Sequence, residues 1–296
     1  MKIIVTGSLG HISKPLAQEL VQKGHSVTVI SSNPGKQKDI EALGATAAIG
    51  SLEDVPFLTT AFTGADAVYC MIPPVNYFNH NLDLMAECSK LANNYKQAIL
   101  QAEVKQVVHL SSIGAHTDKG NGMLLFHYLV ENILRELPQD VAIKHLRPVG
   151  FYYNLFAFIH TIKTQGAIVS NYGNIEEPWV SPIDIAAVAA EEITTAFDGI
   201  KIRYIASEEL NCNEVASILG AAIGKPDLKW LVIPDEQLLD GLIAAGMNPG
   251  IAKGFVEMNA GRRGGLYEDY YRNKPTLGKV KLKDFAKEFA AVYNQQ

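Results

Sequence analysis

Residues 3–13 constrain the fold most strongly, because a short apolar run passes directly into a glycine turn that opens a helix. Gly7 lets the backbone turn tightly off the strand, and Gly10 removes a side chain where an anion would approach the first free N–H groups of the helix. Those donors and the positive end of the helix dipole favour a phosphate. Ser13 stands at the third position of the G-x-x-G-x-x-G spacing, so we expect slightly looser packing there.

The surroundings of this turn indicate a dinucleotide site. A second apolar strand, residues 26–30, follows the helix, and Gly24 stands where that helix should stop. Strand, glycine turn, helix and strand in this order are typical of dinucleotide binding, and a turn with a purely structural role is the alternative. The cofactor contacts predicted here are Thr6, Gly7, Leu9, Gly10, His11 and Ile12.

Composition excludes several classes of partner. The chain has 296 residues, 48% of them hydrophobic and 19% charged, which is enough for a large core. A net charge of −5 gives no general attraction to nucleic acid or anionic membrane, so neither is expected as a partner. No leader and no run of about 18 apolar residues stands out, so we expect a cytoplasmic protein. The odd number and wide spacing of Cys70, Cys88 and Cys212 suggest neither disulfides nor a metal site.

Strands and helices alternate through the first half of the chain, which predicts an α/β fold with a doubly wound parallel sheet of the Rossmann type. Apolar periodicity places strands at 2–6, 26–30, 45–49, 66–71, 105–110 and 141–146. The helices predicted between them cover 11–23, 54–62, 80–102 and 123–136.

The second half predicts a smaller, mostly helical substrate lobe over 151–296. Its helices are expected near 153–164, 182–196, 212–223, 235–245, 249–260 and 282–292, with strands at 167–170 and 201–206. The last of these strands is apolar enough to extend the first sheet. We therefore expect the dinucleotide domain, 1–150, to include residues 182–206 as well, so that the two lobes interleave.

The end of the second strand bears on the choice of nicotinamide cofactor. An acidic residue there would accept hydrogen bonds from the ribose 2′-hydroxyl, but no carboxylate occurs before Asp39. Hydroxyls of Ser31 and Ser32 and the charge of Lys36 suit a 2′-phosphate. This pattern favours NADP over NAD, and an ordinary solvated loop is the alternative.

Four further segments resemble the NmrA-like branch of the atypical short-chain dehydrogenase/reductases, a group that includes quinone reductases and triphenylmethane reductase. These are Met71-Ile72-Pro73-Pro74, Ser111-Ser112-Ile113-Gly114-Ala115, the segment 146–154 (LRPVGFYYN) and the segment 179–186 (WVSPIDIA). The resemblance implies that nicotinamide and substrate lie over the strand ends, between the lobes. It extends the predicted cofactor contacts to Met71, Ile72, Pro73, Ser111 and Ser112.

Aromatic side chains crowd the same segments and suggest a flat aromatic substrate. The predicted substrate contacts are Pro74, Tyr77, Phe151, Tyr152 and Asn154, with ordinary core packing as the alternative for the aromatic residues. Arg147 is expected to pair with an acid such as Glu131 rather than to hold a substrate acid. The basic turn 259–265 is expected to be a solvated face, and a mobile lid is the alternative.

The proton donor of the short-chain dehydrogenases, a Tyr with a Lys four residues later, has no counterpart on the helix predicted at 123–136. Tyr128 is followed by Asn132, and Met123 precedes His127. His127 is similar in position to a histidine of NmrA-like reductases and is the catalytic candidate, either orienting the substrate or relaying a proton. The alternative is a structural histidine bonded to a carbonyl or to Glu131.

These observations predict an NADPH-dependent oxidoreductase that transfers a hydride to a quinone or a similar electrophilic aromatic. Such a product needs less proton assistance than an alkoxide does. The alternative is a non-catalytic regulator that senses NAD(P) and binds a protein partner. An epimerase or dehydratase is disfavoured by the missing pair, and a homodimer is compatible with the sequence.

Overall fold

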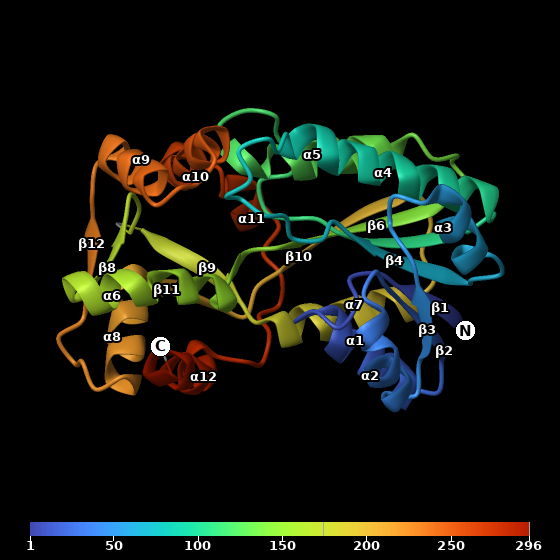
Figure 1. Cartoon of the computed structure of the whole chain (residues 1–296), viewed down its shortest axis with the longest axis horizontal. Coiled ribbons are helices and arrows are strands. Elements are labelled where there is room, and N and C mark those ends of the chain that lie inside the picture. The colour runs from blue at the N-terminus through green and yellow to red at the C-terminus, as the bar shows by residue number, and fades with distance from the viewer. Residues whose placement is uncertain (174, 296) are drawn as a thin grey trace.

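The computed structural model describes residues 1–173 and 175–295, and its ribbon separates into a larger lobe built on one wide sheet and a smaller lobe (Figure 1). No helix within the described residues is long and apolar enough to cross a membrane.

A seven-stranded parallel sheet forms the centre of the larger lobe, in the order β10-β6-β5-β4-β1-β2-β3. Chain order reverses between β1 and β4, and ligands of such sheets bind at the carboxyl ends of the strands at this point. The predicted doubly wound fold is therefore confirmed. The strands are β1 (Lys2–Val5), β2 (Ser26–Ser31), β3 (Thr46–Ile49), β4 (Ala67–Met71), β5 (Gln106–Leu110), β6 (Ala142–Pro148) and β10 (Ile200–Ile205).

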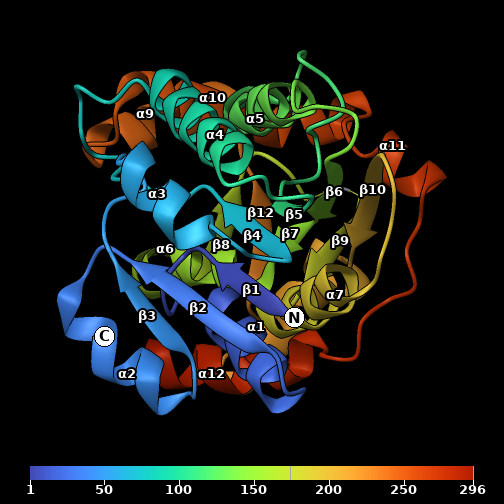
Figure 2. The same ribbon diagram turned by 90° about the vertical axis from the view of Figure 1, so that its right-hand side faces the viewer.

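Helices cover both faces of this sheet (Figure 2). One face packs against α1 (Ser13–Gln22), α2 (Gln37–Ala42) and α7 (Pro182–Thr194), and the other against α3 (Val55–Phe62), α4 (Leu84–Gln101) and α5 (Leu125–Arg135). The short helices η1 (Pro34–Lys36) and α2 were not predicted, because Asn33-Pro34-Gly35 signals a turn. Ile40, which is fully buried, holds α2 against the sheet.

Residues 182–205 contain α7 and β10 of the larger lobe. Strand β10 pairs with β6, with Ile202 opposite His145, and so extends the sheet at one edge. Tyr204 and Ile205 near the end of β10 are buried, whereas Ile200 and Ile202 near its start are exposed.

The smaller lobe contains more strands than expected. The three-stranded sheet has the order β11-β9-β7, and β12 pairs with β8. Only β8 was predicted. Its strands are β7 (Gly150–Phe151), β8 (Ala167–Ser170), β9 (Glu176–Val180), β11 (Glu208–Asn211) and β12 (Lys229–Val232). The remaining helices of the chain are η2 (Gly122–Leu124), η3 (Tyr152–Phe158), α6 (Ile159–Gln165), α8 (Cys212–Ala222), α9 (Asp235–Ala244), α10 (Pro249–Gly261), η4 (Arg262–Gly264), α11 (Glu268–Arg272) and α12 (Leu282–Gln295).

The segment 179–186 holds the C-terminal part of the chain through hydrogen bonds. Ser181 caps α7 by accepting a hydrogen bond from the backbone N–H of Ile183, and buried Asp184 accepts from the backbone N–H groups of Lys279 and Val280 at 3.1 and 3.0 Å. A Cβ at Gly278 would lie 2.3 Å from the Asp184 carboxylate, so a side chain there would displace this clamp.

The basic turn 259–265 differs from the expected solvated face. The Arg262 guanidinium lies 3.9 Å from the centre of the Tyr172 ring and donates a hydrogen bond to fully buried Glu177 at 2.8 Å. Arg263 donates two hydrogen bonds to Asp235. Arg262, paired and largely buried, therefore anchors this turn in the smaller lobe, while Arg263 is exposed.

Candidate functional site

The turn between β1 and α1 is closely packed around Gly7. This residue has φ +90°, and a Cβ there would lie 2.3 Å from the Sδ atom of Met71 and 2.5 Å from the Oγ atom of Ser13. Both the backbone angle and the space therefore require glycine. Gly10 donates its N–H to the Gly7 carbonyl at 3.2 Å and completes the turn.

Free backbone donors line this turn. Among the described residues, none accepts a hydrogen bond from the N–H of Leu9, His11 or Ile12. Helix α1 begins directly after them, and its first turn carries no acidic side chain. Unpaired N–H groups at the positive end of a helix form an anion site, so these three donors could hold a diphosphate.

Ser13 tightens the turn instead of loosening it. The side chain is 1% exposed, and its hydroxyl donates to the Thr6 carbonyl at 2.8 Å. Thr6 in turn accepts from the N–H of Met71 at 3.1 Å through its hydroxyl, which joins β1 to β4. The expectation of looser packing was wrong because a buried serine hydroxyl can bridge helix and strand where glycine would make no bond.

The end of β2 divides the predicted phosphate-binding residues into two groups. Ser31 is buried, and its hydroxyl accepts hydrogen bonds from the Ser8 hydroxyl at 2.8 Å and from the N–H of Asn33 at 3.2 Å. Ser32 is exposed and Lys36 is partly exposed, and the Lys36 ammonium lies 3.5 Å from the carboxylate of exposed Asp39. Ser32 and Lys36 are thus accessible to a ligand, whereas Ser31 shapes the turn.

The segment after β4 is held by two elements. The Tyr95 hydroxyl on α4 donates to the Met71 carbonyl at 2.8 Å. Farther along, Asn248 at the start of α10 donates its side-chain amide to the Asn79 carbonyl at 3.0 Å and its backbone N–H to the Tyr77 carbonyl at 2.9 Å. Ile72, Pro73 and Tyr77 are partly buried, and Pro74 is exposed.

At the ends of β5 and β6, buried polar side chains form one network. The Ser111 hydroxyl donates to Glu131 at 2.6 Å, and Glu131 also accepts two hydrogen bonds from Arg147, at 2.9 and 2.7 Å. The predicted Arg147–Glu131 pair is thus confirmed. Burial alone would raise the pKa of Glu131, but the hydrogen bonds and charge of Arg147 outweigh it and lower this pKa to about 2. Ser112, next to this network, is partly exposed.

His127 lies one helical turn before Glu131 on α5, but no hydrogen bond joins the two residues. Its Nδ1 atom is buried and has no partner among the described residues, and its ring packs on Phe126. Burial, with a smaller contribution from His109, lowers the pKa of His127 to about 3. The ring is therefore neutral at physiological pH, and it can offer a hydrogen bond but no imidazolium proton.

The two tyrosines after β7 have different environments. Tyr152, an expected substrate contact, is fully buried, stacks on Phe285 and donates its hydroxyl to Glu208 at 3.1 Å. It belongs to the core of the smaller lobe, so that expectation is corrected. Tyr153 is 39% exposed and Asn154 is exposed, while Phe151 is partly buried.

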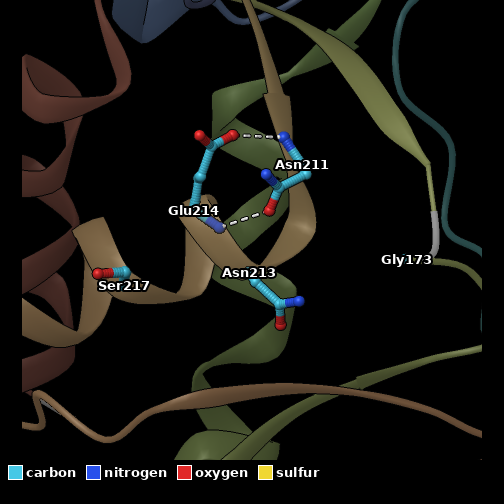
Figure 3. Close-up of a pocket in the computed structure, with 5 residues that line it drawn as sticks. All are labelled: Gly173, Asn211, Asn213, Glu214 and Ser217. Atoms are coloured by element: carbon cyan, nitrogen blue, oxygen red, sulfur yellow. Dashed lines mark hydrogen bonds between the residues drawn. The ribbon is translucent and has the colours of Figure 1, made fainter.

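Two surface hollows lie beside the starts of α8 and α10. One, of about 690 Å³, surrounds the start of α8, where Asn211 and Glu214 cap the helix through reciprocal hydrogen bonds at 3.0 and 2.8 Å (Figure 3). The other, of about 500 Å³, lies between the start of α4 and α10. Within the described residues, no group of three or more His, Cys, Asp or Glu side chains could hold a metal.

Comparison with known proteins agrees with this architecture. The NmrA-like family model matches residues 1–266. An NAD(P)H azoreductase of Xenophilus azovorans is 25% identical over 259 residues, which cover 87% of this chain and 86% of the relative.

Two solved structures share the fold over nearly the whole length. The NADPH complex of an NADPH-dependent quinone oxidoreductase from Escherichia coli aligns with a TM-score of 0.79 at 20% identity, covering 97% of this chain and 99% of that one. The NADP(H) complex of triphenylmethane reductase from Citrobacter sp. aligns with a TM-score of 0.76 at 20% identity, again covering 97% and 99%. The resemblance expected from the sequence is confirmed, and the chain belongs to the NmrA-like family.

Proposed function

We propose that this protein is an NADPH-dependent reductase that transfers a hydride to a quinone or a similar electrophilic aromatic compound. The observation that carries the proposal is the set of free N–H groups at Leu9, His11 and Ile12. They lie at the sheet edge where the strand order reverses, which is where dinucleotides bind in such folds. The names of the azoreductase, quinone oxidoreductase and dye reductase relatives support the reaction class.

Preference for NADP rests on the loop after β2. Ser32 is exposed and Lys36 is partly exposed there, and Asp39, the first carboxylate along the chain after β2, is the exposed partner of Lys36. An exposed ion pair of this kind is weak, so a doubly charged 2′-phosphate competes well for the lysine. The ribose of NAD would find no carboxylate acceptor before Asp39.

The chemistry proceeds without a tyrosine–lysine pair. When bound, the nicotinamide supplies the hydride. Reduction of a quinone or cationic dye gives a delocalised product, so orientation of the substrate contributes most of the rate. Neutral His127 offers a hydrogen bond to the substrate, and Ser112 lies beside the Ser111–Glu131 network that fixes the end of β5. Protons reach the product from solvent.

Aromatic recognition comes from both lobes. Tyr77 and Pro74 follow β4, and Phe151 and Asn154 follow β6. A flat substrate between these segments would stack on rings and place its polar atoms near the Asn154 amide.

The test is a reductase assay over a panel of quinones, azo dyes and triphenylmethane dyes. We expect the purified protein to oxidise NADPH with at least one quinone or cationic dye, and NADH to serve less well at equal concentration. Binding of NADPH with no oxidation by any acceptor would contradict the proposal and favour a sensor that binds a protein partner. Equal affinity for NADH and NADPH would contradict the assignment of Ser32 and Lys36 as contacts of the 2′-phosphate.

A further inference from the structure

Tyr153 of the smaller lobe lies directly against the dinucleotide turn. Its ring centre is 4.0 Å from that of His11, with the planes inclined by 42°. The backbone N–H of His11 is one of the free donors of the turn. The smaller lobe thus places Tyr153 against the side chain of a residue whose backbone N–H is one of these donors.

Packing from behind holds Tyr153 in this position. Its ring meets Phe156 edge-on at 5.1 Å, and Phe156 stacks on Phe289 at 5.7 Å with nearly parallel planes. This chain of rings leads from the turn into the core of the smaller lobe, where Phe289 is fully buried. Tyr153 is thus presented by a supported aromatic stack rather than by a free loop.

The hydroxyl of Tyr153 is available to a ligand. Among the described residues it makes no hydrogen bond, and the side chain is 39% exposed. The neighbouring Tyr152 is the opposite case, since its hydroxyl donates to Glu208 inside the core. Of two adjacent tyrosines, one is structural and the other offers a donor at the turn.

We propose that Tyr153 is the contact of the smaller lobe with the diphosphate of the bound dinucleotide, its hydroxyl donating a hydrogen bond to a phosphate oxygen. This proposal rests on the proposed function, because it requires a dinucleotide in the turn. A donor from the smaller lobe makes cofactor binding depend on both lobes, and it orders the junction beside the substrate contacts Phe151 and Asn154. A hydrogen bond to a charged phosphate is stronger than one between neutral groups.

The experiment compares Tyr153→Phe, which removes only the hydroxyl, with Tyr153→Ala, which also removes the ring. NADPH dissociation constants are measured by fluorescence titration, together with thermal midpoints and kcat at saturating NADPH. We expect Tyr153→Phe to weaken NADPH binding roughly tenfold and Tyr153→Ala to weaken it further, with an unchanged thermal midpoint for the phenylalanine variant. Tyr271→Phe is the matched control, because Tyr271 is 37% exposed and donates to the Glu176 carbonyl, and its NADPH affinity should equal that of the wild type.

The outcomes separate this proposal from the proposed function. If wild-type protein binds NADPH and Tyr153→Phe binds it equally well or better, the tyrosine contact is overturned while the reductase assignment stands. If Tyr153→Phe weakens NADPH binding but no acceptor is reduced, the contact is supported and the reductase assignment fails. A wild-type protein that binds no NADPH overturns both.

Discussion

The Glu131 carboxylate on α5 and the Arg147 guanidinium at the end of β6 form a buried, two-point ion pair, with N–O distances of 2.9 and 2.7 Å. Arg147 is 3% exposed and Glu131 is 1% exposed. Ser111 adds a hydrogen bond from the end of β5, and Arg147 reaches Tyr204 on β10 at 3.3 Å. The pair therefore joins three strand ends beside the candidate site.

Breaking this pair should be costly. Glu131→Ala leaves the Arg147 charge buried with much of its hydrogen bonding lost, and we expect the free energy of unfolding to fall by about 3–5 kcal/mol. Urea denaturation measures the change. Glu53→Ala, which removes an exposed pair with Lys90, is the control and should have little effect. A loss in Glu131→Ala no larger than that of the control would contradict the assigned role.

Acid should destabilise the protein through buried neutral histidines. Burial lowers the pKa of His109 to about 4 and that of His145 to about 3, and their Nδ1 atoms are hydrogen-bonded at 3.1 Å. In the unfolded chain both would titrate near pH 6.5. Between these pH values the unfolded state binds protons that the folded state does not bind. The free energy of unfolding is therefore highest above about pH 6.5 and falls as the pH drops towards about 4.

Denaturation near pH 7 and near pH 5 tests this dependence, with an expected loss of about 2 kcal/mol for each histidine. His109→Asn keeps a side-chain nitrogen near the position of Nδ1 but does not titrate, so its loss between the two pH values should be smaller. His160→Asn, at an exposed position on α6, should retain the wild-type loss. Identical pH dependence in all three proteins would contradict the histidine explanation.

Gly7→Ala should abolish dinucleotide binding. The new Cβ would lie 2.3 Å from Met71 at φ +90°, so the turn carrying the free N–H groups must deform. Gly24→Ala is the matched control, because Gly24 also has a positive φ, +81°, but has no atom within 4 Å of the added Cβ. This control should lose about 1 kcal/mol of stability and keep its NADPH affinity. Calorimetric titration with NADPH measures the affinity of each variant. Tight binding of NADPH by Gly7→Ala would contradict the role of this turn in dinucleotide binding.

Asn248→Ala should affect the substrate more than the cofactor. The change removes the N-cap of α10 and the side-chain bond to the Asn79 carbonyl, which together stabilise the segment after β4. We expect a loss of about 1–2 kcal/mol in unfolding free energy and a raised KM for the acceptor, with the NADPH dissociation constant unchanged. The exposed Asn213→Ala is the control. An unchanged KM for the acceptor in Asn248→Ala would show that the segment after β4 does not contribute to substrate binding.

The sequence predicted the larger lobe well because its signals are local. Parallel strands buried on both faces appear as continuous apolar runs, and the glycine turn has a spacing that can be recognised directly. The strands β9 and β11 were missed because each carries two glutamates. Glu177 pairs with Arg262, and Glu208 and Glu209 accept hydrogen bonds from tyrosines, so inward-facing side chains look like surface ones in the sequence.

The candidate site could be predicted by segment but not always by residue. Tyr152 and Tyr153 are adjacent and identical in type, and only the packing of η3 on α12 makes the first structural and presents the second. Ser31 and Ser32 were both predicted to contact the 2′-phosphate. The Ser31 hydroxyl instead accepts a hydrogen bond from Ser8, which lies 23 positions earlier in the chain. Such pairings depend on tertiary contacts that a local pattern does not contain.

The most direct test of the hydride-transfer account uses NADPH in which both hydrogens at C4 of the nicotinamide are replaced by deuterium, with a cationic triphenylmethane dye as acceptor. We predict that the wild-type protein produces a reduced dye with deuterium at its central carbon, detected by mass spectrometry. Gly7→Ala should form no such product, and Gly24→Ala should form it as the wild type does. A reduced dye without deuterium, or no reduced acceptor across the whole panel, would contradict the account.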